Sequence, residues 1–146
     1  MKTYFVDTSS LFKRYLPGRG SEQMDALFRE DAEVFISTLS VIEFLSNLQR
    51  LRSVDNAVTD AQFAEVWSAF SLDVATGRIQ TLAVSAEVID RATQLLLPRY
   101  VTPIDALQVA AAMSLGPETV VVSSDRQLNQ LVTGLGVWHM DPSREE

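Results

Sequence analysis

The 146-residue chain has no cysteine, a single histidine and no long apolar run. Without cysteine it can form no disulfide, no zinc site with thiolate ligands and no thiol nucleophile. Zinc usually also binds histidine, but the chain has only one, His139. This residue is interpreted as a polar residue near a strand end rather than as a metal ligand. Because no apolar stretch approaches the ~18 residues of a membrane span, we expect no membrane partner and a cytoplasmic location.

A surplus of positive charge is also missing, since 19 acidic residues face 12 basic ones and the net charge is −7. Broad adhesion to nucleic acid normally rests on many lysines and arginines that neutralise phosphates, so this composition disfavours it. Ten of the basic residues are arginine, the type suited to bidentate phosphate contacts. A nucleic-acid partner therefore stays possible.

The chain alternates between short apolar runs and segments with helical periodicity. This alternation predicts an α/β fold with a mainly parallel sheet covered by helices on both faces. In the absence of a linker, we expect one domain over residues 1–141 and a frayed tail at residues 142–146. The predicted strands are residues 3–7, 34–37, 79–82, 119–123 and 137–139, and the predicted helices are residues 10–16, 22–29, 41–52, 60–72, 86–97, 103–115 and 126–133.

Four acids stand where such a sheet would bring them together. Asp7 and Asp125 come at or just after the ends of predicted strands, whereas Glu43 and Asp105 are placed in the first turns of predicted helices. In open α/β sheets ligands bind outside the carboxyl ends of the strands, where the following helices begin. All four carboxylates are therefore expected to reach one crevice.

Each acid also has a purely structural interpretation, as a turn former or a helix cap. Capping explains acids at helix starts one at a time, but it does not require them at the same edge of one sheet. Ser124 stands one position before Asp125 and is an equally good cap, so Asp125 is not needed as a cap. The residues concerned are Asp7, the capping-box pair Ser40 and Glu43, the similar pair Thr102 and Asp105, and Ser124 or Asp125.

A cluster of carboxylates needs a compensating cation. Two such charges ~4 Å apart repel by ~4 kcal/mol at an effective dielectric constant near 20, so an uncompensated cluster would destabilise the fold. Mg²⁺ and Mn²⁺ suit the site because hard cations take carboxylate and water oxygens as ligands. The sequence therefore predicts a Mg²⁺ or Mn²⁺ site.

Four segments resemble, in order, the four acidic motifs of PIN-domain nucleases, and are most similar to those of VapC-type toxins from toxin–antitoxin modules. They are Asp7-Thr8-Ser9-Ser10-Leu11, the segment 39–48 around Glu43, Ile104-Asp105-Ala106-Leu107 running into residues 110–113, and the segment 122–128 around Asp125. The likeness covers nearly the whole chain. It implies a three-layer α/β/α domain around a sheet of about five strands.

The resemblance further implies a metal-dependent endoribonuclease with RNA as its substrate and a small antitoxin protein as its partner. Asp7, Glu43, Asp105 and Asp125 would be the catalytic, metal-binding acids, and Ser9 and Ser123 their polar neighbours. A metal held by these acids would activate a water for in-line attack on phosphorus and neutralise charge on the phosphoryl oxygens. Metal-free cleavage through the 2′-hydroxyl is disfavoured because it needs a general acid and a general base near neutrality.

One alternative function and one question of packing stay open. Instead of an enzyme, the chain could be a non-catalytic interaction module that uses the same acidic pocket to bind metal or a partner's basic tail. The aromatic stripe formed by Phe63, Trp67 and Phe70 is interpreted as core or as an interface between two copies, and a homodimer is expected.

Overall fold

A five-stranded sheet forms the centre of the computed structural model, which describes residues 1–144. Residues 145 and 146, the end of the expected tail, lie outside the described residues. All neighbouring strands are parallel, so the expected α/β sheet is confirmed, and the carboxyl ends of its strands share one edge. The spatial order is β3 (Gln80–Leu82), β2 (Ala32–Ser37), β1 (Lys2–Val6), β4 (Val120–Val122) and β5 (Trp138–Met140).

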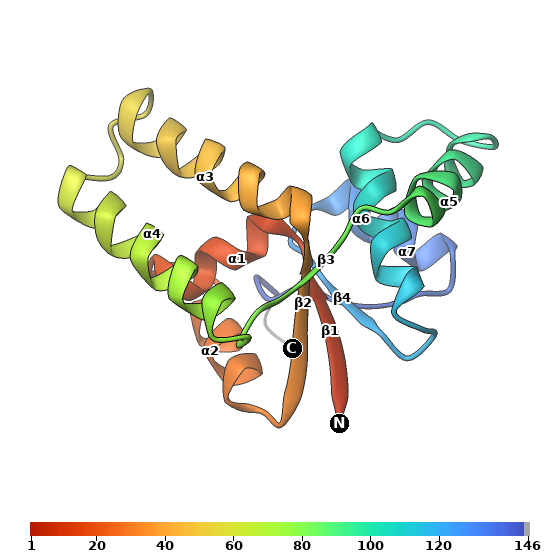
Figure 1. The fold of residues 1–146 in the computed structure, drawn as a ribbon, viewed down its shortest axis with the longest axis horizontal. Coiled ribbons are helices and arrows are strands. Elements are labelled where there is room, and N and C mark those ends of the chain that lie inside the picture. Colours follow the sequence, from red (N-terminus) through yellow and green to blue (C-terminus); the bar gives the residue numbers. More distant parts are fainter. Residues whose placement is uncertain (145–146) are drawn as a thin grey trace.

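Within residues 1–144, seven helices cover the two faces of the sheet and complete the expected three layers (Figure 1). The two faces follow from the alternation of side chains along each strand: Tyr4 and Val6 join one buried cluster, and Phe5 joins the other. The first cluster packs against α1 (Thr8–Tyr15), α2 (Ser21–Arg29), α3 (Thr38–Ser53) and α4 (Asp60–Ala75), and the second against α5 (Ala86–Leu96), α6 (Pro103–Ser114) and α7 (Arg126–Gly134). In the described part of the chain, none of these helices combines the length and apolarity needed to cross a membrane.

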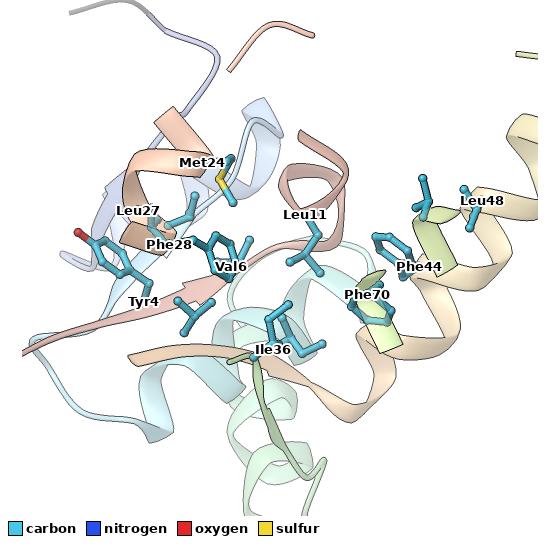
Figure 2. Packing of buried hydrophobic residues seen from close by; sticks show 14 residues of the cluster. Tyr4, Val6, Leu11, Met24, Leu27, Phe28, Ile36, Phe44, Leu48 and Phe70 are labelled. Atoms are coloured by element: carbon cyan, nitrogen blue, oxygen red, sulfur yellow. The ribbon is translucent and has the colours of Figure 1, made fainter. Parts of the chain in front are cut away.

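Aromatic stacking anchors α3 in the first cluster (Figure 2). The ring of Phe44 is fully buried between those of Phe12 and Phe70, with centroid distances of 4.3 and 4.1 Å. Burying a phenylalanine contributes about 1.5 to 3 kcal/mol, so this contact fixes the rotation of α3 about its axis. The direction of the neighbouring Glu43 side chain is fixed with it.

The aromatic stripe on α4 belongs to the same core. Phe70 is buried, and Phe63 and Trp67 are partly buried against the cluster that contains it. The guanidinium of Arg52 lies 3.9 Å from the centre of the Phe63 ring and covers it from α3. Of the two interpretations of this stripe, the structure therefore supports the core.

A partly buried ion pair ties α1 to α4. The guanidinium Nε of Arg14 donates to Asp73 at 2.9 Å, and the Tyr15 hydroxyl donates to the same carboxylate at 2.6 Å. Burial, together with this acid, raises the pKa of Tyr15 far above its ordinary value, so the hydroxyl keeps its proton. Since α1 begins immediately after Asp7, this pair helps to hold the first site segment in place.

Candidate active site

Asp7 lies in the centre of the carboxyl edge of the sheet. Its backbone N–H donates to the carbonyl of Val122 at 2.9 Å, which continues the pairing of β1 with β4. Its carboxylate oxygen Oδ2 accepts hydrogen bonds from the hydroxyls of Ser9 at 2.7 Å and Ser123 at 3.1 Å. Asp7 occupies the N-cap position of α1, but its side chain makes no capping hydrogen bond. Both serines expected beside the site thus contact this acid.

Glu43 lies in the second turn of α3, so the prediction of a first-turn position was wrong. The helix begins at Thr38, directly after β2, and Ser37 caps it by accepting the N–H of Ser40 at 3.3 Å. The capping box proposed for Ser40 and Glu43 does not form. The strongest structural explanation for this acid is thereby removed.

The Glu43 carboxylate is held by two side chains from other helices. Its Oε1 accepts from the Thr8 hydroxyl on α1 at 3.3 Å and from the Gln108 amide on α6 at 3.1 Å. Sequence reasoning missed both contacts. A signal for Gln108 was present, because it is one polar residue within an otherwise apolar stretch of α6, residues 106–113, and such residues are rarely buried without partners.

Asp105 and Asp125 stand at the starts of two helices on the other face of the sheet. As predicted, Pro103 begins α6 and Thr102 caps it, accepting the N–H of Asp105 at 3.2 Å. Asp125 itself caps α7, since its Oδ1 accepts the N–H of Leu128 at 3.0 Å. The expectation that Asp125 is not needed as a cap was therefore wrong. Its carboxylate caps the helix and also repels the carboxylates of Asp7 and Asp105.

The four acids, called the acidic pocket below, influence one another electrostatically. Burial raises the pKa of Asp7; hydrogen bonds from Ser9 and Ser123 oppose this rise, and repulsion from Asp125 adds to it. Burial also raises the pKa values of Glu43 and Asp105, and repulsion from Asp7 contributes to both. Each of the four carboxylates is thus coupled to at least one other, although they come from four separate segments.

The pocket offers only oxygen atoms as ligands, a set that matches Mg²⁺ or Mn²⁺ rather than zinc. Within residues 1–144, no three acidic or histidine side chains are grouped closely enough to form a ready metal shell. Like charges without a cation between them favour separation. Direct coordination by three of these acids would therefore require side-chain rotation.

The raised pKa values predict how stability depends on pH when divalent cations are chelated. A carboxyl whose pKa is raised by folding holds its proton more tightly in the folded state. It therefore stabilises the folded state below its ordinary pKa, and this stabilisation is lost as pH rises through the raised value. For Asp7, with an ordinary value of 3.8, ionisation at neutral pH is therefore destabilising. We expect Asp7→Asn to unfold at a higher temperature than wild type at pH 7, with the difference shrinking toward pH 4.

Thermal melts in chelator across this pH range measure the effect. Asp90→Asn, at an exposed position on α5, is the matched control. An Asp7→Asn protein that melts below wild type at pH 7 would mean that the carboxylate is a structural group.

These observations define a parallel α/β/α domain with four coupled acids at the carboxyl edge of its sheet. The sequence matches the PIN domain family over residues 4–132. The chain belongs to this family, whose toxin members are generally nucleases. Comparison with curated protein sequences finds no significant match.

Several solved structures share the fold. FitAcB from Neisseria gonorrhoeae is 16% identical, with 97% of this chain and 99% of that chain covered and a TM-score of 0.69. The DNA-bound VapBC from Salmonella typhimurium is 15% identical with the same coverage and a TM-score of 0.67. VapBC-1 from nontypeable Haemophilus influenzae is 13% identical, again with 97% and 99% covered and a TM-score of 0.64. At these identities the likeness establishes the fold alone.

Proposed function

We propose that this protein is a metal-dependent endoribonuclease that acts as the toxin of a toxin–antitoxin pair. The observation that carries the proposal is the electrostatic coupling of Asp7, Glu43, Asp105 and Asp125 at one sheet edge of a PIN domain. Helix capping accounts for Asp125, but it accounts for neither Asp7 nor Glu43. A cluster that costs stability without a cation is more simply explained by a catalytic task.

Each residue of the pocket has a role in this proposal. Ser9 and Ser123 hold the Asp7 carboxylate by hydrogen bonds that favour its ionised form. Thr8 and Gln108 hold the Glu43 carboxylate by hydrogen bonds to its Oε1. A divalent cation bound there would lower the pKa of a coordinated water and neutralise charge on the phosphoryl oxygens. The acids are the groups that would orient the attacking water.

The test is cleavage of a panel of transfer, ribosomal and messenger RNAs by the purified protein. We expect endonucleolytic products with Mg²⁺ or Mn²⁺, no products in chelator, and recovery when the metal is added back. Asp7→Asn, purified in parallel, controls for contaminating nucleases. Cleavage that persists equally in chelator, or in the Asp7→Asn sample, would contradict the proposal.

The rival function is a non-catalytic module whose acidic pocket binds metal or a basic tail. Both functions predict that Mn²⁺ raises the melting temperature, because a ligand that binds only the folded state stabilises it. Only the enzyme predicts RNA products. A protein that is stabilised by Mn²⁺ and leaves every RNA of the panel intact would favour the module.

Two protein partners belong to the proposal. The structure from Klebsiella pneumoniae that shares this fold is described as a toxin–antitoxin complex, which supports a small cognate antitoxin here.

The other partner is a second copy of the chain. It would find exposed apolar side chains next to two site acids, because Ile42 precedes Glu43 and Ile104 precedes Asp105. Leu97 and Tyr100 add further exposed apolar surface before α6. Sedimentation of the purified protein would reveal a homodimer, and a monomer at all concentrations would exclude it.

A further inference from the structure

We propose that Gln108 is a positioning residue that holds Glu43 in the geometry from which it binds metal. This inference rests on the proposed function of the acidic pocket. The Gln108 side chain is 2% exposed, and its Nε2 donates to Glu43 Oε1 at 3.1 Å and to Ser40 Oγ at 3.0 Å. One amide therefore links α6 to both a site acid and the helix that carries it.

Hydrogen-bond accounting fixes the orientation of this amide. A carboxamide has two N–H donors, and both are used, one for Ser40 and one for Glu43. Rotating the amide by 180° would turn its oxygen toward the Glu43 carboxylate, so that two acceptors would face each other. The nitrogen therefore faces Glu43.

The amide is itself held by a buried chain of hydroxyls. Ser40 Oγ lies 3.2 Å from Ser37 Oγ, and because Ser40 Oγ accepts from Gln108, its own proton is available for Ser37. This chain begins at the end of β2 and reaches Glu43 through α6. Rigid support of this kind restricts the rotamers of a carboxylate and reduces the entropy lost when it takes up a ligand.

The position of Gln108 also connects two of the site acids. It lies three residues after Asp105 on α6, and residues with this spacing are neighbours on one helix face. The Gln108 Oε1 atom is buried and has no hydrogen-bond partner among the residues that the structure describes. An unpaired buried oxygen costs stability, which is easier to understand at a functional site than in an ordinary core contact.

The alternative is that Gln108 only joins α6 to α3. In that case its removal would lower the melting temperature and leave metal affinity unchanged.

The deciding experiment is calorimetric titration of Mn²⁺ into the full-length protein without RNA. Gln108→Met keeps the length of the side chain and removes both donors. We expect it to weaken Mn²⁺ binding by about 10-fold to 100-fold, the usual effect of removing a group that orients a metal ligand.

Two controls make the result specific. Ser40→Ala removes the hydroxyl that supports the amide while leaving the bond to Glu43, so it should weaken Mn²⁺ binding by less than Gln108→Met does. In a Glu43→Gln background, Gln108→Met should cause no further loss of affinity, because a positioning residue acts only through the group it positions. Gln108→Asn, which keeps the polar amide but is one methylene shorter, is expected to weaken binding too and serves if Gln108→Met does not fold.

Unchanged Mn²⁺ affinity in folded Gln108→Met or Gln108→Asn would overturn the inference, as would a full additional loss in the Glu43→Gln background. Failure of the proposed function looks different. A wild-type protein that binds Mn²⁺ but cuts no RNA would contradict the nuclease while the affinities still decide the role of Gln108. A wild-type protein that binds no Mn²⁺ would overturn both.

Discussion

Replacing Asp7 or Asp105 with asparagine is expected to lower RNA cleavage by about a thousandfold or more while the protein stays folded. Each substitution removes a charge that would hold the cation, and losing several kcal/mol of transition-state stabilisation produces a change of that size. Neither carboxylate side chain is a helix cap, because α6 is capped by Thr102 and the Asp7 side chain makes no capping bond. The fold should therefore tolerate both changes.

The measurement compares initial cleavage rates and far-ultraviolet circular dichroism of the variants with those of wild type. Asp90→Asn again serves as the control, since it removes one aspartate outside the pocket and should cleave at the wild-type rate. If Asp7→Asn and Asp105→Asn are both unfolded, these acids are structural. If they are folded and fully active, the acidic pocket is not the catalytic site.

Inhibition by a cognate antitoxin is the second expected result. If a small open reading frame lies beside this gene, its co-expression with this chain should yield a stable complex whose RNA cleavage is undetectable at concentrations where the free protein is active. The physical reason is the acidic pocket: its clustered carboxylates, in a chain of net charge −7, attract a cationic side chain. A guanidinium placed among these carboxylates would compete with the metal.

The aromatic stripe on α4 is engaged within the protein, because Phe70 is buried and Phe63 and Trp67 pack against the core. An antitoxin would therefore bind other apolar surface. Purification of the two proteins together, followed by the RNA assay, measures the outcome. Separate elution of the two proteins, or a complex as active as the free chain, would reject this regulation and leave the nuclease proposal standing.

Local signals in the sequence were enough to predict every helix and strand. The strands β1, β2 and β4 each contain a short apolar run, and several helix starts carry recognisable caps, such as Ser85 before α5 and the Thr102-Pro103 pair before α6. The start of α3 was misplaced because Ser37 and Ser40 are both suitable caps. Only the tertiary contact of Ser40 with Gln108 shows that the second serine is needed inside the protein.

The edge of the sheet at which the acids lie could be predicted from its parallel strands, but the helical turn that carries Glu43 and the partners of the acids could not. Strand order decides that Ser123, after β4, lies beside Asp7, after β1, although 116 residues separate them. Contacts of Glu43 with α1 and α6 depend on how three helices pack, which local periodicity does not specify. Sequence alone therefore suggested which acids belong to the site, and packing determined which side chains hold them.

The most direct test of the acidic pocket is a crystal structure of the protein soaked in millimolar Mn²⁺, with the metal located by its anomalous scattering. The account predicts a peak among Asp7, Glu43, Asp105 and Asp125, with carboxylate oxygens of at least two of them at about 2.1 Å from the ion. Soaked crystals of Asp105→Asn should show a weaker peak or none. Well-ordered crystals of the wild-type protein without metal at this position, or with metal only elsewhere, would contradict the central claim.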